Sequence, residues 1–275
     1  MHSRPWGRGA PPGQRRLATA ALGGSRRPTH AHPSGGADLK AVRGPSWTEI
    51  AARGRRCLLI VPLGSYEQHG PHLPLDTDTC IAAALAERAV ELPFVVVASP
   101  LAYGASGEHR GFPGTLSMGT ACLAEVVVEL VRSARTSCSG VVVVNAHGGN
   151  GEALELARRR CQAEGDQVRV WNATIESGDA HAGRTETSLM LAIAPDSVRL
   201  GAIHPGRLEP LQQLWPELRS AGVRAVSPNG VLGDPTLASA DEGLRILEAL
   251  SARLIAVLRS WWSEIEFVTS ATSAR

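Results

Sequence analysis

Four apolar, β-branched runs recur along this chain, and each is followed by a polar loop and then by a helical pattern. They cover residues 57–62, 94–98, 141–144 and 168–171. Nearly continuous apolar runs of this length are typical of strands in a parallel sheet, because helices cover both faces of such a sheet. The alternation therefore predicts a single α/β domain, a three-layer α/β/α sandwich with a mainly parallel sheet.

Helical spacing of apolar residues predicts the elements between and after the strands. We expect helices over residues 46–53, 80–92, 122–137, 152–164 and 241–262, and one that ends at residue 194. The last helix carries a leucine stripe that is most simply its packing face. Residues 199–234 contain few periodic signals and several prolines and glycines, so we expect an extended excursion that lines the cleft mouth or an oligomer interface.

The two ends of the chain differ in composition from its centre. Residues 1–40 hold six arginines and Lys40 against Asp38 alone and are rich in small residues and proline, which predicts a disordered extension. We expect the folded domain to span residues 41–267 and a short tail to span 268–275. Beyond the extension, 25 acidic residues outnumber 21 basic ones. The folded part is therefore mildly acidic, and its charge does not favour nucleic-acid binding.

The cysteines and the hydropathy of the chain indicate its environment. Five cysteines are an odd number, and none forms a Cys-x-x-Cys pair, which argues against a disulfide framework and a cysteine zinc site. All five lie in apolar or helical contexts, where a small buried side chain is the usual role. No apolar run approaches the ~18 residues of a membrane span, and the N-terminus lacks the apolar centre of a secretory signal. We expect a cytoplasmic protein without a membrane partner.

The strongest chemical signal follows the first apolar run. Residues 61–78 read V-P-L-G-S-Y-E-Q-H-G-P-H-L-P-L-D-T-D and contain five metal-binding side chains, which are Glu67, His69, His72, Asp76 and Asp78. In an open α/β sheet the ligand crevice lies outside the carboxyl ends of the strands. His147 and Glu186 also follow predicted strands. We therefore expect one site formed by Glu67, His69, Asp78, His147 and Glu186.

The residue types in this set indicate a two-metal centre. Three carboxylates and two imidazoles without a thiolate suit Zn²⁺, Fe²⁺ or Mn²⁺. Two such cations share a bridging carboxylate and a bridging water that becomes the nucleophile. Each residue also has a structural explanation: a lone histidine is often a satisfied structural residue, and Asp78 can be a helix N-cap. Their joint occurrence after successive strands favours a binuclear metallohydrolase.

Other polar residues in the same loops have supporting roles. We expect His72 and Asp76 to orient the ligands through hydrogen bonds. The loop histidines His181 and His109 are free to act as acid, base or oxyanion partner. Glu108 either binds substrate or forms a surface ion pair.

The segment after the third run is rich in glycine. We expect Gly148 and Gly149 to adopt positive φ and to let the backbone approach the cleft closely. Asn150 is expected to cap the next helix or to donate a hydrogen bond to substrate.

Four separated motifs resemble the creatininase family of amidohydrolases, in the family's order. They are the segment P-L-G-S-Y-E-Q-H-G-P-H-L-P-L-D-T-D and the later S-G-E-H-R-G-F-P-G-T, N-A-H-G-G-N and H-A-G-R-T-E-T-S, and the match covers about residues 45 to 262. The resemblance implies a three-layer α/β/α fold, two divalent metal ions per subunit and a homo-oligomer. It implies the ligands Glu67, His69, Asp78 as the bridge, His147 and Glu186, and it places the catalytic histidine at His181.

One departure from the family bears on the substrate. Creatinine-hydrolysing members resemble N-x-H-x-E-N in the third motif, whereas this chain has Gly149 where their ligand glutamate stands. The remaining motifs are most similar to members that act as peptidases and remove a C-terminal Val-Tyr dipeptide from a short, modified precursor peptide in a redox-cofactor pathway. The alternatives are hydrolysis of a small cyclic amide or formamide, such as creatinine or a formylamino-pyrimidine, and a non-catalytic metal or peptide carrier. Closed four-ligand tetrahedra are usual for structural metal sites, which disfavours the carrier.

Overall fold

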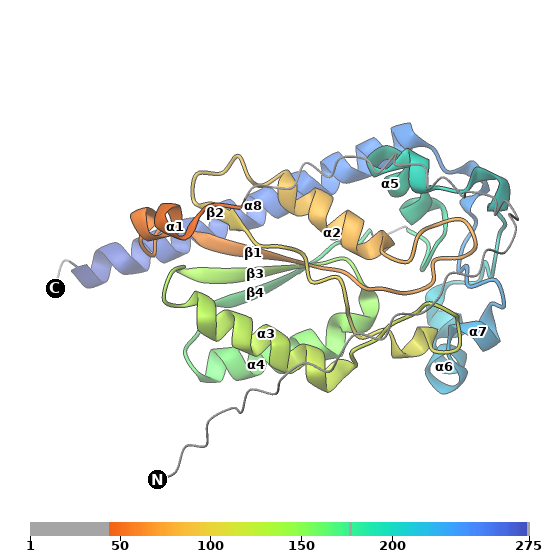
Figure 1. Ribbon diagram of the computed structural model, residues 1–275, viewed down its shortest axis with the longest axis horizontal. Helices are drawn as coiled ribbons and strands as arrows, with labels where there is room; N and C mark the ends of the chain where they lie inside the picture. Colours follow the sequence, from red (N-terminus) through yellow and green to blue (C-terminus); the bar gives the residue numbers. More distant parts are fainter. Residues whose placement is uncertain (1–43, 176–177, 274–275) are drawn as a thin grey trace, which may run out of the picture. The chain divides into compact units, whose positions relative to one another are not determined.

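The four apolar runs form one parallel sheet in the computed structural model, which describes residues 44–175 and 178–273, with side chains as far as Phe267. The strands are β1 Leu58–Leu63, β2 Val95–Val97, β3 Gly140–Asn145 and β4 Val168–Asn172. Their order is β2-β1-β3-β4, and every pairing is parallel (Figure 1). This confirms the predicted sheet. The expected extension 1–40 and the last residues of the expected tail lie outside the described part of the chain.

Helices cover both faces of the sheet, as the apolar strands require. The longer helices are α1 Trp47–Arg53, α2 Thr77–Glu87, α3 Thr120–Ala134, α4 Gly151–Ala163, α5 Arg184–Ile193, α6 Leu211–Ala221 and α8 Ala240–Ser273. On one face, α2, α5 and α8 enclose a core that includes Ile60 and Val142. On the other face, α3 and α4 pack on Val61 and Val143 (Figure 1). Successive strand residues thus enter opposite cores, and the domain is the predicted three-layer sandwich.

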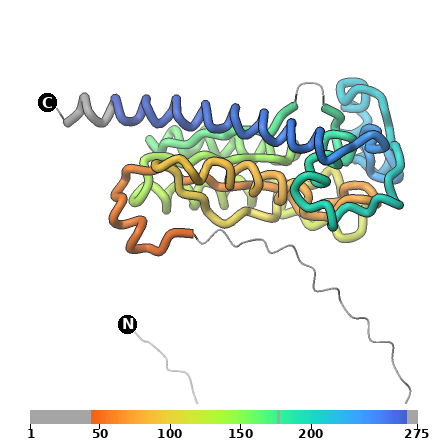
Figure 2. Tube along the Cα trace, turned by 90° about the horizontal axis from the view of Figure 1, so that it is seen from above, coloured from red at the N-terminus to blue at the C-terminus, as the bar shows by residue number. Residues whose placement is uncertain are grey.

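The last helix is longer than its expected end at residue 262. It continues to Ser273, and Figure 2 shows it lying along the rest of the domain. Near its far end, Trp262 stacks on Phe94 with ring centroids 4.9 Å apart. By contrast, α2 ends at Glu87, five residues before its predicted end, and the following residues form successive turns that still bury Leu92.

Residues 199–234 were expected to be an extended excursion, and this is wrong where the segment is helical. It contains α6 and the one-turn helix α7 Val223–Val226. Pro216 lies inside α6 and obscures its helical pattern, yet Leu214 and Leu218 are one turn apart and both buried. They form a small apolar cluster with Val223, Val226, Leu232 and Phe112. Phe112 lies in the loop after β2, so this cluster joins the segment to that loop.

Three of the five cysteines have the expected buried position. Cys57, Cys138 and Cys161 are buried, whereas Cys80 is half-buried and Cys122 is exposed on α3, and all five are free. Among the described residues, no helix has the length and apolarity to cross a membrane.

Candidate metal centre

The polar loops after the four strands meet at the carboxyl end of the sheet. Segments after β1, β2, β3 and β4 bring together Glu67, His69, Asp78, Glu108, His109, His147, His181 and Glu186. All five predicted ligands are in this group, as are both loop histidines. These residues therefore lie outside the carboxyl ends of the strands, where open α/β sheets bind their ligands.

Glu67 is at the centre of the group and is completely buried. Its Oε2 lies 3.1 Å from His147 Nε2, and its Oε1 lies 3.2 Å from His109 Nε2 and 3.8 Å from His181 Nδ1. Despite these distances, neither carboxylate oxygen has a hydrogen bond. Burial raises the pKa of Glu67 to about 7, while the imidazole of His147 opposes the shift.

Asp78 lies between two imidazoles, as a bridging ligand would. Its Oδ1 is 3.1 Å from His69 Nε2, and its Oδ2 is 3.3 Å from His147 Nδ1. Ser65 Oγ donates a hydrogen bond to the same Oδ2 at 2.8 Å. Burial acts to raise the pKa of Asp78, but the two histidines outweigh it and hold that pKa well below its usual range. Asp78 is inside the first turn of α2 and is not its N-cap, so the structural explanation for it is wrong.

His69 and His147 respond to the same carboxylates. Burial alone would lower the pKa of His69, but Asp78 and then Glu186 raise it to about 10. The pKa of His147 is likewise raised well above its ordinary value, since Glu67 and Asp78 outweigh the effect of burial. These two imidazoles therefore favour the protonated form beside the buried carboxylates.

Glu186 completes the group from the first turn of α5. Its Oε2 lies 3.7 Å from His69 Nε2 and accepts a 2.6 Å hydrogen bond from the backbone N–H of Ala182. Burial raises the pKa of Glu186 to about 7. Ala182 has a φ of 51°, a left-handed value that an alanine rarely adopts, next to the predicted catalytic residue His181.

The donor set fits divalent cations. Three groups of side chains hold ligand atoms within 4.8 Å of one another: Glu67 with His69 and Asp78, His69 with His181 and Glu186, and Glu67 with His109 and His181. Glu67 belongs to two of these groups, and its buried oxygens have no hydrogen bond of good geometry, which favours positive charge beside them. His147 faces Glu67 with one ring nitrogen and Asp78 with the other.

Sequence reasoning missed Gln68, which stands between the predicted ligands Glu67 and His69. Its side chain is buried, and its Nε2 lies 2.9 Å from His109 Nδ1 and 3.0 Å from His181 Nε2. The available signal was its position, because a polar residue between two predicted ligands is carried into the same cleft.

The Glu108 carboxylate occupies the space where a side chain at position 149 would lie. The Oε1 of Glu108 lies 3.4 Å from His147 Nε2, and about a third of its side chain is exposed. A Cβ on Gly149 would overlap that oxygen and approach the carbonyl of Ala105 to 2.6 Å. The expected close approach at Gly149 is therefore present. The expected positive φ at Gly148 and Gly149 is wrong, because neither adopts it.

Asn150 is the N-cap residue of α4, but its side chain makes no capping hydrogen bond and instead connects three loops. Its Oδ1 accepts from Ala105 N at 2.8 Å, and its Nδ2 donates to Gly64 O at 3.0 Å and to Asn145 Oδ1 at 2.9 Å. Ala105 and Gly64 follow β2 and β1, and Asn145 is the last residue of β3. Asn150 is completely buried, so the expected capping hydrogen bond is wrong and its polar atoms serve to hold the loops together.

The remaining two predicted residues lie further out. His72 is buried, with Nε2 2.9 Å from Thr187 Oγ1, and burial lowers its pKa to about 4. Asp76 is the N-cap residue of α2, where its side chain interacts with Cys80. Neither appears among the metal-competent groups of the described residues.

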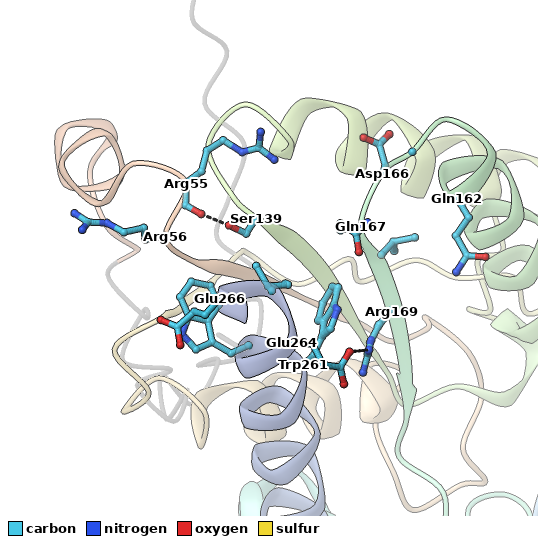
Figure 3. A pocket seen from close by; sticks show the side chains of 14 residues that line it. Arg55, Arg56, Ser139, Gln162, Asp166, Gln167, Arg169, Trp261, Glu264 and Glu266 are labelled. Atoms are coloured by element: carbon cyan, nitrogen blue, oxygen red, sulfur yellow. Dashed lines mark hydrogen bonds and ion pairs between the residues drawn. The ribbon is translucent and has the colours of Figure 1, made fainter. Parts of the chain in front are cut away.

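A pocket of about 1120 Å³ opens at the opposite end of the sheet. Figure 3 shows it between the starts of the strands and α8, with Trp261 beside Arg169. Arg169 pairs with Glu264 across the pocket at 2.5 Å. None of the predicted site residues lines it.

Comparisons with known proteins agree with this geometry. The family model described as "Creatininase: Creatinine amidohydrolase" matches residues 45–258. The chain is 53% identical over 195 residues to the mycofactocin precursor peptide peptidase of Mycolicibacterium smegmatis, which covers 69% of this chain and 79% of that protein. It is 48% identical over 214 residues to the protein of the same name from Mycobacterium ulcerans, with 74% and 85% covered.

A solved structure gives the same fold. A mutant creatininase described as "Zn-Zn type" superposes with a TM-score of 0.67 at 28% identity, over 80% of this chain and 97% of that one. The family model matches residues 45–258, and the fold agrees with that of the solved creatininase. This chain belongs to the creatininase family.

Proposed function

We propose that this chain is a metal-dependent peptidase that removes a C-terminal dipeptide from a short precursor peptide. The observation that carries the chemistry is Glu67, whose two buried oxygens have no hydrogen bond. The observation that carries the substrate is the similarity to two relatives named mycofactocin precursor peptide peptidase. The family resemblance adds that the dipeptide is Val-Tyr.

The proposed cofactor is a pair of divalent ions per subunit, Zn²⁺ or Fe²⁺, with Mn²⁺ also suited to the ligands. Glu67, His69, Asp78, His147 and Glu186 would hold the pair, with Asp78 shared. When bound, such ions polarise a carbonyl and lower the pKa of water toward neutrality.

The protein's own residues orient this chemistry. Ser65 fixes one oxygen of Asp78 through its 2.8 Å hydrogen bond. Ala182 N–H fixes Glu186, and the carbonyl of Glu67 lies 3.1 Å from His69 Nδ1, so that Nε2 of this ring faces the centre. His181, which is 7% exposed, is the proposed catalytic residue that moves a proton during peptide-bond hydrolysis.

The test uses metal-loaded protein and the precursor peptide, with mass spectrometry for the released dipeptide. A peptide that lacks the last two residues and creatinine form the comparison arms. We expect cleavage of the full peptide only, and its loss with a chelator. Turnover of creatinine without peptide cleavage would refute the peptidase and favour hydrolysis of a small cyclic amide.

Two variants test the ligands and the catalytic residue. Asp78→Asn is expected to abolish binding of both ions, measured as metal per subunit, whereas Asp196→Asn makes the same change at an exposed position and should keep them. His181→Ala is expected to keep the metal and lose about 10²–10³ in turnover. A His181→Ala protein with full metal and full activity would refute its role.

We also propose that the active form is a cytoplasmic homo-oligomer, in line with the family resemblance. Light scattering of the purified full chain measures the mass directly. A mass near 29.0 kDa at working concentration would contradict the oligomer.

A further inference from the structure

We propose that Gln68 is a positioning residue for His109 and His181. It directs a protonated ring nitrogen of His109, Nε2–H, and an unprotonated ring nitrogen of His181, Nδ1, toward the group of side chains around Glu67. The inference rests on the proposed hydrolysis for its chemical meaning, but the ring tautomers it assigns are measurable without any substrate.

The orientation of the Gln68 amide is set by its own loop. The backbone N–H of Gly70 donates to Gln68 Oε1 at 2.9 Å, so this atom must be the carbonyl oxygen. The amide nitrogen consequently faces the cleft. Gly230 has a φ of 81°, and a Cβ there would overlap Oε1, so the backbone packs tightly against the amide.

The two amide hydrogens then have two acceptors. One is the carbonyl of Gly230, 3.1 Å from Nε2, which can only accept. The other is His109 Nδ1 at 2.9 Å, which accepts only if it carries no proton. The proton of the neutral His109 ring is therefore on Nε2, the atom that lies 3.2 Å from Glu67 Oε1.

Gln68 also sets the tautomer of His181, but in this ring the unprotonated nitrogen faces Glu67. Its Nε2 lies 2.8 Å from the backbone carbonyl of Gln68, so Nε2 carries the proton and donates it. The 3.0 Å approach of Gln68 Nε2 to the same nitrogen is then a contact between two donors, because both amide hydrogens are already used. His181 Nδ1 is left without a proton and lies 3.8 Å from Glu67 Oε1.

Packing prevents the two rings from exchanging these roles. The ring centroids are 4.4 Å apart, and His109 and His181 are 3% and 7% exposed. The backbone of His181 is also fixed, since its N–H donates to Leu232 O at 3.2 Å and its carbonyl accepts from Leu232 N at 2.8 Å. Water has little access to replace either hydrogen bond.

This arrangement orders the proton transfers. His181 Nδ1 first accepts a proton from the attacking water as the new C–O bond forms. It then gives that proton to the amine nitrogen as the C–N bond breaks, so one water is consumed and His181 returns to its starting tautomer. Meanwhile, His109 Nε2–H donates a hydrogen bond to negative charge in the centre. His181 is thus a base before it is an acid.

The experiment is nitrogen NMR of the zinc-loaded protein with ¹⁵N-labelled histidine. His109→Gln and His181→Gln assign the two rings by loss of their signals. We expect the Nε2–H tautomer for both rings in the unaltered protein. A proton on Nδ1 of either ring would overturn the proposal, and this result does not depend on the substrate.

Gln68→Glu provides the second arm, since its carboxylate keeps an acceptor for Gly70 and removes the donor to His109. We expect the proton of His109 to move to Nδ1, turnover to fall at least tenfold, and KM and metal content to change less than threefold. Gln162→Glu makes the same change on the exposed face of α4 and should alter neither spectrum nor rate. An unchanged His109 signal in Gln68→Glu would also overturn the proposal. Failure of peptide cleavage with the expected tautomers would instead refute the proposed substrate.

Discussion

Replacing Asn150 with alanine should cost the protein about 4 kcal/mol of its free energy of unfolding. The substitution leaves the backbone N–H of Ala105 and the carbonyl of Gly64 buried without a partner. Each orphaned group costs about 1–3 kcal/mol. The third partner, Asn145 Oδ1, retains the N–H of His147 at 3.3 Å and adds little. A loss of this size is a large part of the ~5–15 kcal/mol that stabilises most domains.

Asn172→Ala is the matched control. Asn172 is exposed and accepts one hydrogen bond from Asn145 Nδ2, which also donates to His147 O at 2.8 Å. Its loss should cost about 1 kcal/mol or less. Urea unfolding of the metal-free proteins, followed by tryptophan fluorescence, to which buried Trp171 and Trp261 contribute, compares the two variants at equal protein concentration. If Asn150→Ala were no less stable than Asn172→Ala, the argument that one amide fastens three strand ends would fail.

Three further results are expected. Gly149→Ala should lower turnover at least tenfold in folded protein, because the new methyl group overlaps the Glu108 carboxylate; full activity would show that this space is free. Leu218→Ala should cost about 2–5 kcal/mol in urea unfolding, since Leu218 is 7% exposed in the small cluster under α6, and a loss below 1 kcal/mol would contradict that packing. Burial, followed by His147, lowers the pKa of His109 to about 3. Below pH 6.5 the His109 side chain therefore binds a proton in the unfolded state but stays neutral in the folded state. Metal-free protein should therefore lose stability as pH falls from 6.5 toward 3, and His109→Gln should flatten that slope; equal slopes would refute the neutral buried ring.

The strands and their layers were predictable because each signal is local. The valines of β3 place apolar side chains on both faces of the strand, and only a sheet covered by helices on each side buries such a run. The helix α6 was not predictable by the same route, because Pro216 interrupts its pattern and its stability comes from a cluster with Val226 and Leu232. That packing depends on contacts between distant parts of the chain.

The site shows the same division. The position of Glu67, Asp78 and His147 after strands was sufficient to predict that they meet. The left-handed backbone of Ala182 was not visible, because glycine is the residue that usually signals such a conformation. The role of Asn150 was also hidden, since its three partners lie in or after three different strands.

Two buried amides hold the loops of this centre in place. Asn150 ties the strand ends together, and Gln68 orients two imidazoles, so every polar side-chain atom of both amides has a partner. Glu67 is the contrast: it is completely buried, yet neither of its oxygens has a hydrogen bond of good geometry, and the groups beside them are the imidazoles of His147 at 3.1 Å and His109 at 3.2 Å. A buried carboxylate in this setting favours positive charge beside it. The buried carboxylates likewise account for the raised pKa values of His69 and His147.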